Sequence, residues 1–369
     1  MPMMRLTPWI YCLVVLLFAG PATLRAEVTL GTDSFLLFAS RQAASQILAT
    51  DDEYTSRMSQ FDRMLRLKST RSVSPARYFE HMARNALDWT SSDKARLAPL
   101  LRRLSRTLDG YRLPLPKTVL LVKTTGNEEV GEGHTRANAI VLPQHSLSED
   151  DETLLFLLAH ELFHVMTRHD ARFRSAAYAL VGFQTGPEVD LPAAISPLQI
   201  TNPDAPRHDS FIEVRSGGRA VEAVPVLLSR SAVFDPEIGD DLDHYWTLRL
   251  LVIDRPSPGS APVARMRNGA PVLLRLRDVR GYFDQVGRNT RYIIHAEEVL
   301  AENFAFLVTG EVVAEPQRVE ALRKLLIDHG DSLARHQTAI HAERVHITTH
   351  PSHQPQSRSS PYLSANSAG

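Results

Sequence analysis

Cysteine is almost absent from this chain of 369 residues, and the one cysteine present is Cys12. It lies in an apolar run of 12 residues, Trp9–Gly20, between the basic start Met1–Arg5 and small residues that end at Ala26. This order predicts a secretory signal peptide over residues 1–26 that is cleaved after Ala26, although an uncleaved anchor has the same pattern. The mature chain would then have no cysteine, so it would depend on its core rather than on disulfides.

Two further features are lacking. No charge of one sign dominates, since the formal net charge is −1, and a sequence pI near 7.0 argues against nucleic acid as a partner. No segment after the signal approaches the roughly 20 apolar residues of a membrane helix, which predicts no stable membrane span after cleavage. We therefore expect a periplasmic or secreted protein, with 43% hydrophobic residues for its core.

The spacing of apolar residues predicts an α+β fold, mostly helical. Residues 27–116 are expected to form a helical N-terminal region, because apolar residues recur there every three or four positions from 33 to 109. Short β-rich segments follow at 117–125 and 137–143, and a helix is expected from about 150 to 169. The predicted units are a core segment at 117–182, a β-rich insertion at 183–278, a second core segment at 279–345 with two helices, and a disordered tail at 346–369.

The chemistry of the chain is concentrated in the predicted helix at 150–169, where the sequence HELFH interrupts an apolar run. His160 and His164 are four residues apart and so lie about 40° apart on one helix face, where both imidazoles can reach a single ion. Glu161 lies beside that face and can accept a proton from metal-bound water. Buried His and Glu side chains with ordinary partners are the alternative, but such groups are costly in an apolar helix unless they are paired.

A catalytic zinc needs a third protein ligand. Asp170 is the local candidate. In the metzincin arrangement such a ligand follows a turn at a glycine, and the corresponding residue here is Thr167. If the helix continues instead, Asp170 lies about 80° away from the direction of His160. Glu298 and Glu302 are the stronger pair, because they are four residues apart on a later predicted helix. One carboxylate could bind the metal while the other accepts the second N–H of a ligating histidine, and Glu297 is a further candidate ligand.

The HExxH motif followed by a glutamate-bearing helix resembles the gluzincin zinc metallopeptidases, the thermolysin-like group. The resemblance implies Zn²⁺ bound by His160, His164 and Glu298, with Glu161 as general base and Glu302 as the acidic residue behind a histidine. It also implies a zincin-like core with a small mixed sheet over the HExxH helix, and an edge strand at 137–143 that pairs with an extended peptide or protein substrate. The insertion at 183–278 would then overhang the cleft.

Members of this group generally supply a His or Tyr that stabilises the developing oxyanion. Tyr292 is preferred here because it precedes the Glu298 helix, and the other candidates are Tyr282, His295, His244 and Arg136. Two other functions stay open: a zinc hydrolase of a non-peptide ester or amide of the cell envelope, and a non-catalytic zinc-binding scaffold. The histidines near the end, at 336, 341, 346, 350 and 353, fit a solvated tail better than a metal site.

Overall fold

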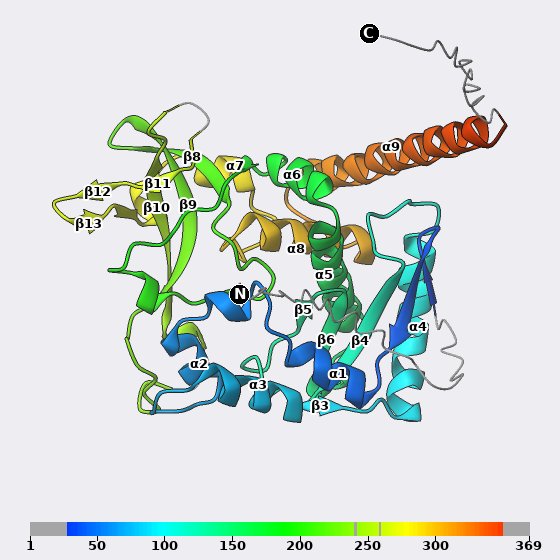
Figure 1. The fold of residues 1–369 in the computed structure, drawn as a ribbon, viewed down its shortest axis with the longest axis horizontal. Helices are drawn as coiled ribbons and strands as arrows, with labels where there is room; N and C mark the ends of the chain where they lie inside the picture. Colours follow the sequence, from blue (N-terminus) through cyan, green and yellow to red (C-terminus); the bar gives the residue numbers. More distant parts are fainter. Residues whose placement is uncertain (1–27, 240–241, 258–259, 350–369) are drawn as a thin grey trace, which may run out of the picture.

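The computed structural model describes residues 28–239, 242–257 and 260–349, with side chains described up to residue 335. The predicted signal peptide and residues 350–369 lie outside the described residues. The chain is an α+β protein with two main sheets (Figure 1). Their elements come from different parts of the sequence, and the helices that carry the HExxH motif and Glu298 pack against each other beside the first sheet.

The first sheet has the strand order β1-β2-β4-β6-β5, and β3 also pairs with β4. Its central pairs, β2 with β4 and β4 with β6, are parallel, whereas β1, β3 and β5 pair antiparallel. The sheet is therefore mixed, and β5 forms one of its edges. The strands are β1 Val28–Leu30, β2 Ser34–Phe38, β3 Ala86–Leu87, β4 Thr118–Thr124, β5 His134–Arg136 and β6 Ala139–Pro143.

The helical spacing that begins at residue 33 predicts a helix over residues 33–48, and this prediction was wrong for residues 34–38. Residues 34–38 form β2, in which Ser34, Leu36 and Phe38 are buried in alternation. This period of two is the pattern of a strand, and its parallel pairing with β4 overrides the helical spacing. Helix α1 begins only at Arg41, where the hydroxyl of Ser40 accepts the N–H of Ala43 at 3.3 Å, and it ends at Leu48.

Helices cover both faces of the first sheet. Along β6, Ile140 and Leu142 pack in the core shared with α4 (Ser91–Thr107) and α5 (Asp151–His169). Ala139 and Val141 pack on the opposite side with α1, α2 (Gln60–Arg66) and α3 (Pro75–Arg84). Both faces of β6 are therefore buried, as expected of a strand inside a sheet that helices cover on both sides.

Helices α5 and α8 form the frame of the candidate site. The carboxylate of Asp150 accepts the N–H groups of Glu152 and Thr153 and so starts α5. Phe156 and Phe163 of α5 contact Phe306 and Phe304 of α8, with ring centroids 5.3 and 5.9 Å apart. Helix α8 spans Ala296–Thr309, and the remaining helices are α6 Ala171–Ala179, α7 Tyr282–Val286 and α9 Pro316–Thr349.

Helix α9 is longer than predicted. The sequence pattern placed its end near residue 328 and a disordered tail from 346, but the helix continues to Thr349 (orange to red in Figure 1). The first proline after Pro316 is Pro351, so no proline interrupts the helix before that point.

The second sheet is antiparallel and has the order β11-β10-β9-β8-β7, with β14 also paired to β10. A separate hairpin, β12–β13, adjoins it, and the whole β-rich region lies on the left in Figure 1. The strands are β7 Phe183–Thr185, β8 Ser210–Ser216, β9 Arg219–Ser229, β10 Trp246–Asp254, β11 Val263–Ala264, β12 Met266–Arg267, β13 Ala270–Pro271 and β14 Leu273–Leu274. Short 3-10 turns are η1 Thr55–Arg57, η2 Gln144–Ser148, η3 Ser196–Leu198, η4 Leu242–His244 and η5 Leu276–Asp278. Between β7 and β8 the chain leaves this sheet and reaches the candidate site.

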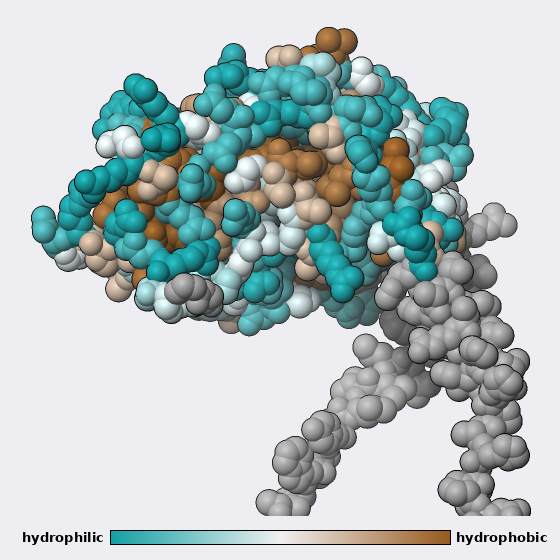
Figure 2. Space-filling view, turned by 90° about the horizontal axis from the view of Figure 1, so that it is seen from above, coloured by the Kyte–Doolittle hydropathy of each residue, from teal (hydrophilic) through white to brown (hydrophobic). Residues whose placement is uncertain are grey.

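The surface is mostly hydrophilic on the face shown in Figure 2, where hydrophobic side chains gather in a band across the middle. Within the described parts of the chain, none of the helices combines the length and the apolar character needed to cross a membrane.

Candidate metal centre

The structure brings together the three residues predicted as ligands. His160 and His164 lie one turn apart on α5, and their ring centroids are 4.7 Å apart. Oε2 of Glu298 on α8 lies 3.1 Å from Nε2 of His160 and 3.6 Å from Nε2 of His164. One potential ligand atom from each residue lies within 4.8 Å of the other two. Two imidazoles and one carboxylate thus converge on a single point from two packed helices.

The hydrogen bonds of His164 fix which nitrogen faces that point. Its Nδ1 lies 2.8 Å from Oε1 of Glu297, so Nδ1 carries the proton and donates a hydrogen bond to the carboxylate. Nε2 then presents its lone pair toward Glu298, and it is buried without a hydrogen-bond partner among the described residues. A buried lone pair beside a buried carboxylate is the environment of a cation. The donor set of two imidazole nitrogens and one carboxylate oxygen fits zinc.

Glu297 occupies the position behind His164 for which the sequence favoured Glu302. Its carboxylate also accepts the hydroxyls of Thr167 at 2.5 Å and Tyr178 at 2.6 Å, so all its contacts hold it away from the ligand point. Among the described residues, neither histidine bonds to Glu302. Glu302 was predicted to accept the second N–H of a ligating histidine. In the structure Glu297 accepts that N–H from His164.

The packing of α8 explains this exchange. Glu297 and Glu298 contact His164 and His160, and Phe306 further along α8 contacts Phe156, nearer the start of α5. The two helices therefore run in opposite directions, and a residue one turn after Glu298 lies beyond His160 rather than behind His164. Glu302 lines the cavity at that end.

Glu161 is buried beside the ligands. Its Oε2 accepts the hydroxyl of Thr135 from β5 at 2.8 Å, and the same hydroxyl lies 3.0 Å from the backbone oxygen of Glu161. Burial raises the pKa of Glu161 to about 7, against the opposing effects of His160 and of the Thr135 hydrogen bond. A carboxyl with a pKa near neutrality can both accept and return a proton at physiological pH.

His160 and Glu298 form a buried ion pair within the chain. Burial disfavours the charged form of His160, but its hydrogen bond to Glu298 and the charge of that carboxylate outweigh burial and raise its pKa to about 9. Burial also opposes the charged form of Glu298, whose pKa is nevertheless held well below its ordinary value by His164 and His160. The cluster thus holds a positive charge next to Glu298 even before a metal binds.

A cavity of about 530 Å³ opens onto the cluster. Its wall includes Phe156, Trp246 and Tyr292 together with His160, Glu161 and Glu298. The ring of Tyr292 lies 6.4 Å from that of His160 by centroids, and 41% of the residue is exposed. A tyrosine in this position can reach a substrate held in the cavity.

The other candidates for an oxyanion donor are held elsewhere. Tyr282 donates its hydroxyl to the backbone oxygen of Ile293 at 2.7 Å. His295 caps α8 through Nδ1, which accepts the N–H of Glu297 at 3.1 Å. Arg136 pairs with Asp52 at 2.9 Å. His244 ends η4 (Leu242–His244) and is not among the residues that line this cavity. Tyr292 is therefore the candidate in the best position.

Asp170 has a structural role at the end of α5. Its Oδ1 accepts the N–H groups of Arg172 and Phe173 and so starts α6, while Oδ2 lies 2.9 Å from Nε2 of His329 on α9. The carboxylate is thereby committed to three partners. It does not join the candidate metal ligands.

The strand at 137–143 was predicted to be the edge strand beside the HExxH helix, and this was wrong. Strand β6 (Ala139–Pro143) lies inside the sheet between β4 and β5. The edge strand is β5, which is three residues long. It follows a glycine-rich sequence, and such a sequence predicts a loop rather than a strand. Its central residue, Thr135, holds Glu161 through the side chain, so the edge strand does lie against the candidate site.

Two residues of the segment between β7 and β8 also contact the site. Asn202 donates its side-chain amide to Oε1 of Glu298 at 2.5 Å, and Asp204 accepts the N–H of Thr135 at 2.9 Å. A carboxylate oxygen of Asp204 lies within 4.8 Å of ligand atoms of Glu161 and His164. Asn202 and Asp204 follow His164 by 38 and 40 residues in the sequence. No sequence spacing relates them to the motif, because only the three-dimensional fold brings them close to it.

Comparison of the chain with protein-family models, with curated proteins and with solved structures found no match. Function is therefore inferred from the residues of the site and their geometry.

Proposed function

We propose that this protein is a zinc-dependent peptide hydrolase of the gluzincin type, with His160, His164 and Glu298 as the metal ligands. The observation that carries the proposal is the convergence of these three side chains with Nε2 of His164 buried and unpartnered. A structural zinc site usually closes with a fourth protein ligand, whereas three ligands beside an open cavity suit a catalytic one.

Bound zinc would act as a Lewis acid that lowers the pKa of a water molecule and polarises the scissile carbonyl. The role of the chain is to hold and move protons around that chemistry. Glu161 accepts a proton at its carboxylate and returns it to the leaving amine, while Thr135 holds that carboxylate in place through Oε2. Glu297 keeps His164 in the tautomer with a free Nε2 lone pair. Tyr292 donates its hydroxyl toward the developing oxyanion.

The proposal extends to the fold and the substrate. The pair α5 and α8, with the mixed sheet beside α5, would be a zincin-like core. An extended peptide would pair with β5, because an edge strand offers unpaired backbone groups next to Glu161. Export through the segment 1–26 remains a prediction from the sequence.

Metal analysis combined with a cleavage assay tests the proposal. The purified protein should contain one zinc per chain and cleave unfolded casein, lose cleavage when zinc is chelated and regain it when zinc is restored. The variant Glu298→Ala should lose stoichiometric zinc, whereas Glu311→Ala, at an exposed residue beyond the end of α8, should retain it. Stoichiometric zinc in Glu298→Ala would remove Glu298 from the ligand set. Zinc binding with hydrolysis of esters but of no peptide would contradict the substrate class.

A further inference from the structure

The segment Gln199–Asp209, here called the strap, crosses the cleft above the HExxH helix. It begins with Gln199 bridged to Leu228 of β9 and ends where β8 begins at Ser210. Residues 202–208 are partly exposed, between the buried residues Thr201 and Asp209. Residues 202–207 make no backbone-to-backbone hydrogen bond within the described part of the chain. Side chains therefore hold this part of the strap in place.

The contacts of the strap reach three elements of the body. Asn202 bonds to Glu298 on α8, and Arg168 of α5 donates to the backbone oxygen of Pro203 at 3.0 Å. Asp204 accepts from Thr135 on β5 at 2.9 Å and lies 3.8 Å from the guanidinium of Arg168. The strap thus fastens across the two helices and the edge strand that frame the candidate site.

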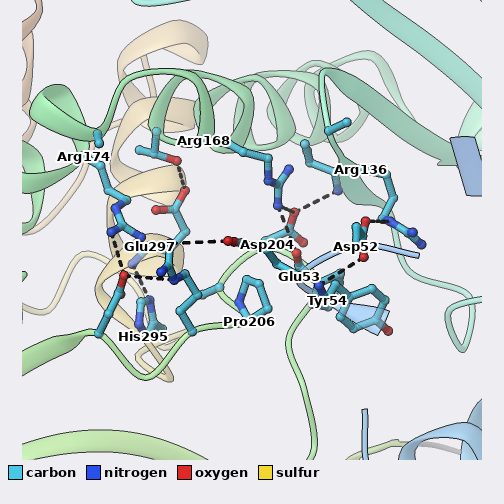
Figure 3. A pocket seen from close by; sticks show the side chains of 18 of the residues that line it. Asp52, Glu53, Tyr54, Arg136, Arg168, Arg174, Asp204, Pro206, His295 and Glu297 are labelled. Atoms are coloured by element: carbon cyan, nitrogen blue, oxygen red, sulfur yellow. Dashed lines mark hydrogen bonds and ion pairs between the residues drawn. The ribbon is translucent and has the colours of Figure 1, made fainter. Parts of the chain in front are cut away.

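The strap also divides the space around the site into two cavities. The cavity of about 530 Å³ that contains His160 and Tyr292 has residues 200–204 in its wall. A second cavity of about 400 Å³, shown in Figure 3, has residues 203–207 in its wall. Pro203 and Asp204 line both, so the strap is the partition between them. Figure 3 shows Asp204 amid the side chains that line this second cavity, between Arg168 and Asp52.

Asp204 binds to β5 at the place where an extended substrate would bind. An edge-strand N–H is the group to which the backbone carbonyl of a strand-like peptide would bind. Here a carboxylate oxygen of Asp204 accepts the N–H of Thr135, and the hydroxyl of the same residue bonds to Glu161. An acceptor from the chain itself therefore occupies the edge strand directly beside the catalytic base.

We propose that the strap is a built-in occupant of the cleft, in which Asp204 takes the place of a substrate carbonyl on β5, and that it must move before an extended polypeptide can bind. This inference rests on the proposed function, since it concerns access to the same site. When the strap moves, the two cavities join into one groove along β5.

Binding of a polypeptide without cleavage tests the strap directly. The probe is fluorescein-labelled unfolded casein, followed by anisotropy in the Glu161→Gln protein loaded with zinc. Replacing Asp204 by Ala in that background should lower the Kd for casein at least fivefold, because the internal competitor is lost. The matched control is Asp190→Ala, at an exposed aspartate outside the strap, which should leave the Kd unchanged. Equal or weaker binding by the Asp204→Ala protein would overturn the proposal.

Hydrogen exchange gives a second measurement that does not depend on an Asp204 variant. On addition of casein to the Glu161→Gln protein, amides of residues 202–208 should exchange faster, while those of β5 should exchange more slowly. Increased protection of residues 202–208 would show that the strap is part of the substrate site rather than its occupant. Zinc content, measured on the same samples, separates the two proposals. Protein that binds no zinc contradicts the metal site, whereas stoichiometric zinc with unchanged strap exchange contradicts the strap alone.

Discussion

The polar network around α2 and the cluster between α5 and α8 are built from similar groups at similar depth, yet they neutralise their charges differently. Around α2, Arg66 bonds to Asp62 at 3.0 Å and to Glu129 at 2.6 Å, and Tyr54 also donates to Glu129. The side chain of Arg66 is only 3% exposed, so its guanidinium is the cation for two buried carboxylates. This network contains its own positive charge.

Between α5 and α8, no lysine or arginine pairs with Glu298 among the described residues. Its partners are His160, His164 and the amide of Asn202. A buried carboxylate needs a nearby positive charge, and imidazoles supply one only when they are protonated. The difference is that a permanently charged guanidinium neutralises the carboxylates around α2, whereas the positive charge beside Glu298 depends on the protonation of imidazoles. Each prediction below alters one side of this comparison.

The largest effect is expected from Glu161→Gln. The amide keeps the shape and the contact with Thr135 but cannot accept a proton, so casein cleavage should fall by about 10³-fold while zinc content stays at one per chain. Initial rates and metal analysis on the same preparation measure both. An equally active Glu161→Gln protein would refute the general base, and the exposed residue Glu149 offers a control substitution to Gln.

Removing the internal cation should destabilise the protein whether or not zinc is present. In Arg66→Met two buried carboxylates lose their partner, so the free energy of unfolding should fall by about 3–5 kcal/mol. The control is Arg84→Met, because that side chain is 69% exposed and its pair with Glu80 should contribute about 0.5 kcal/mol or less. Urea unfolding with and without zinc makes the measurement. A loss in Arg66→Met that zinc fully restores would show that the two clusters are not independent.

The buried His134 of β5 should make the protein sensitive to acid. Burial lowers the pKa of this histidine to about 4. The unfolded chain binds its proton below about pH 6.5 and the folded chain only near pH 4, so folding loses stability as pH falls between these values. One such group accounts for about 3 kcal/mol, on the order of 1.4 kcal/mol per pH unit.

The check is urea unfolding at pH 7, 5.5 and 4 for the wild type, for His134→Asn and for His145→Asn, the last at an exposed residue. The wild type and His145→Asn should lose more stability toward pH 4 than His134→Asn does. Parallel curves for all three proteins would show that His134 does not contribute to the acid sensitivity.

The smallest effect separates two carboxylates on α8. Glu297→Gln leaves the three ligands in place but weakens the acceptor for Nδ1–H of His164, so zinc affinity should fall about 10–100-fold. Glu302→Gln should change it by no more than about twofold, since Glu302 bonds to neither histidine among the described residues. Competition with a coloured zinc chelator measures both affinities. A larger loss in Glu302→Gln than in Glu297→Gln would reverse the assignment made from the structure.

The sequence predicted the groups whose positions follow from helical periodicity. His160 and His164 share a face because they are four residues apart, and Glu298 could be proposed as the partner because it lies four residues before Glu302 on a later helix. The choice between Glu297 and Glu302 depended on the direction in which α8 crosses α5, and a helix pattern does not contain that information. The resemblance therefore favoured Glu302, whereas Glu297 bonds to His164.

The strand β2 and the strap could not be predicted from local sequence patterns, for a related reason. Residues 34–38 fit a helical spacing as well as a strand, and their pairing with β4 across some 80 residues decided between the two. Asn202 and Asp204 belong to a segment without periodicity, and its path across the cleft is set by contacts with α5, α8 and β5. Long-range contacts of this kind cannot be read from spacing along the chain.

Asp170 gives the HExxH helix a fixed end. Its backbone N–H bonds to Met166 at the end of α5, and its carboxylate starts α6 and bonds to His329 of α9, so three helices meet at one residue. Because α6 also supplies Tyr178, which bonds to Glu297, a shift at this corner would be transmitted to the hydrogen bond that orients His164. Asp170 therefore braces the orientation of His164, and that orientation depends in part on α9, whose His329 lies outside the candidate cluster.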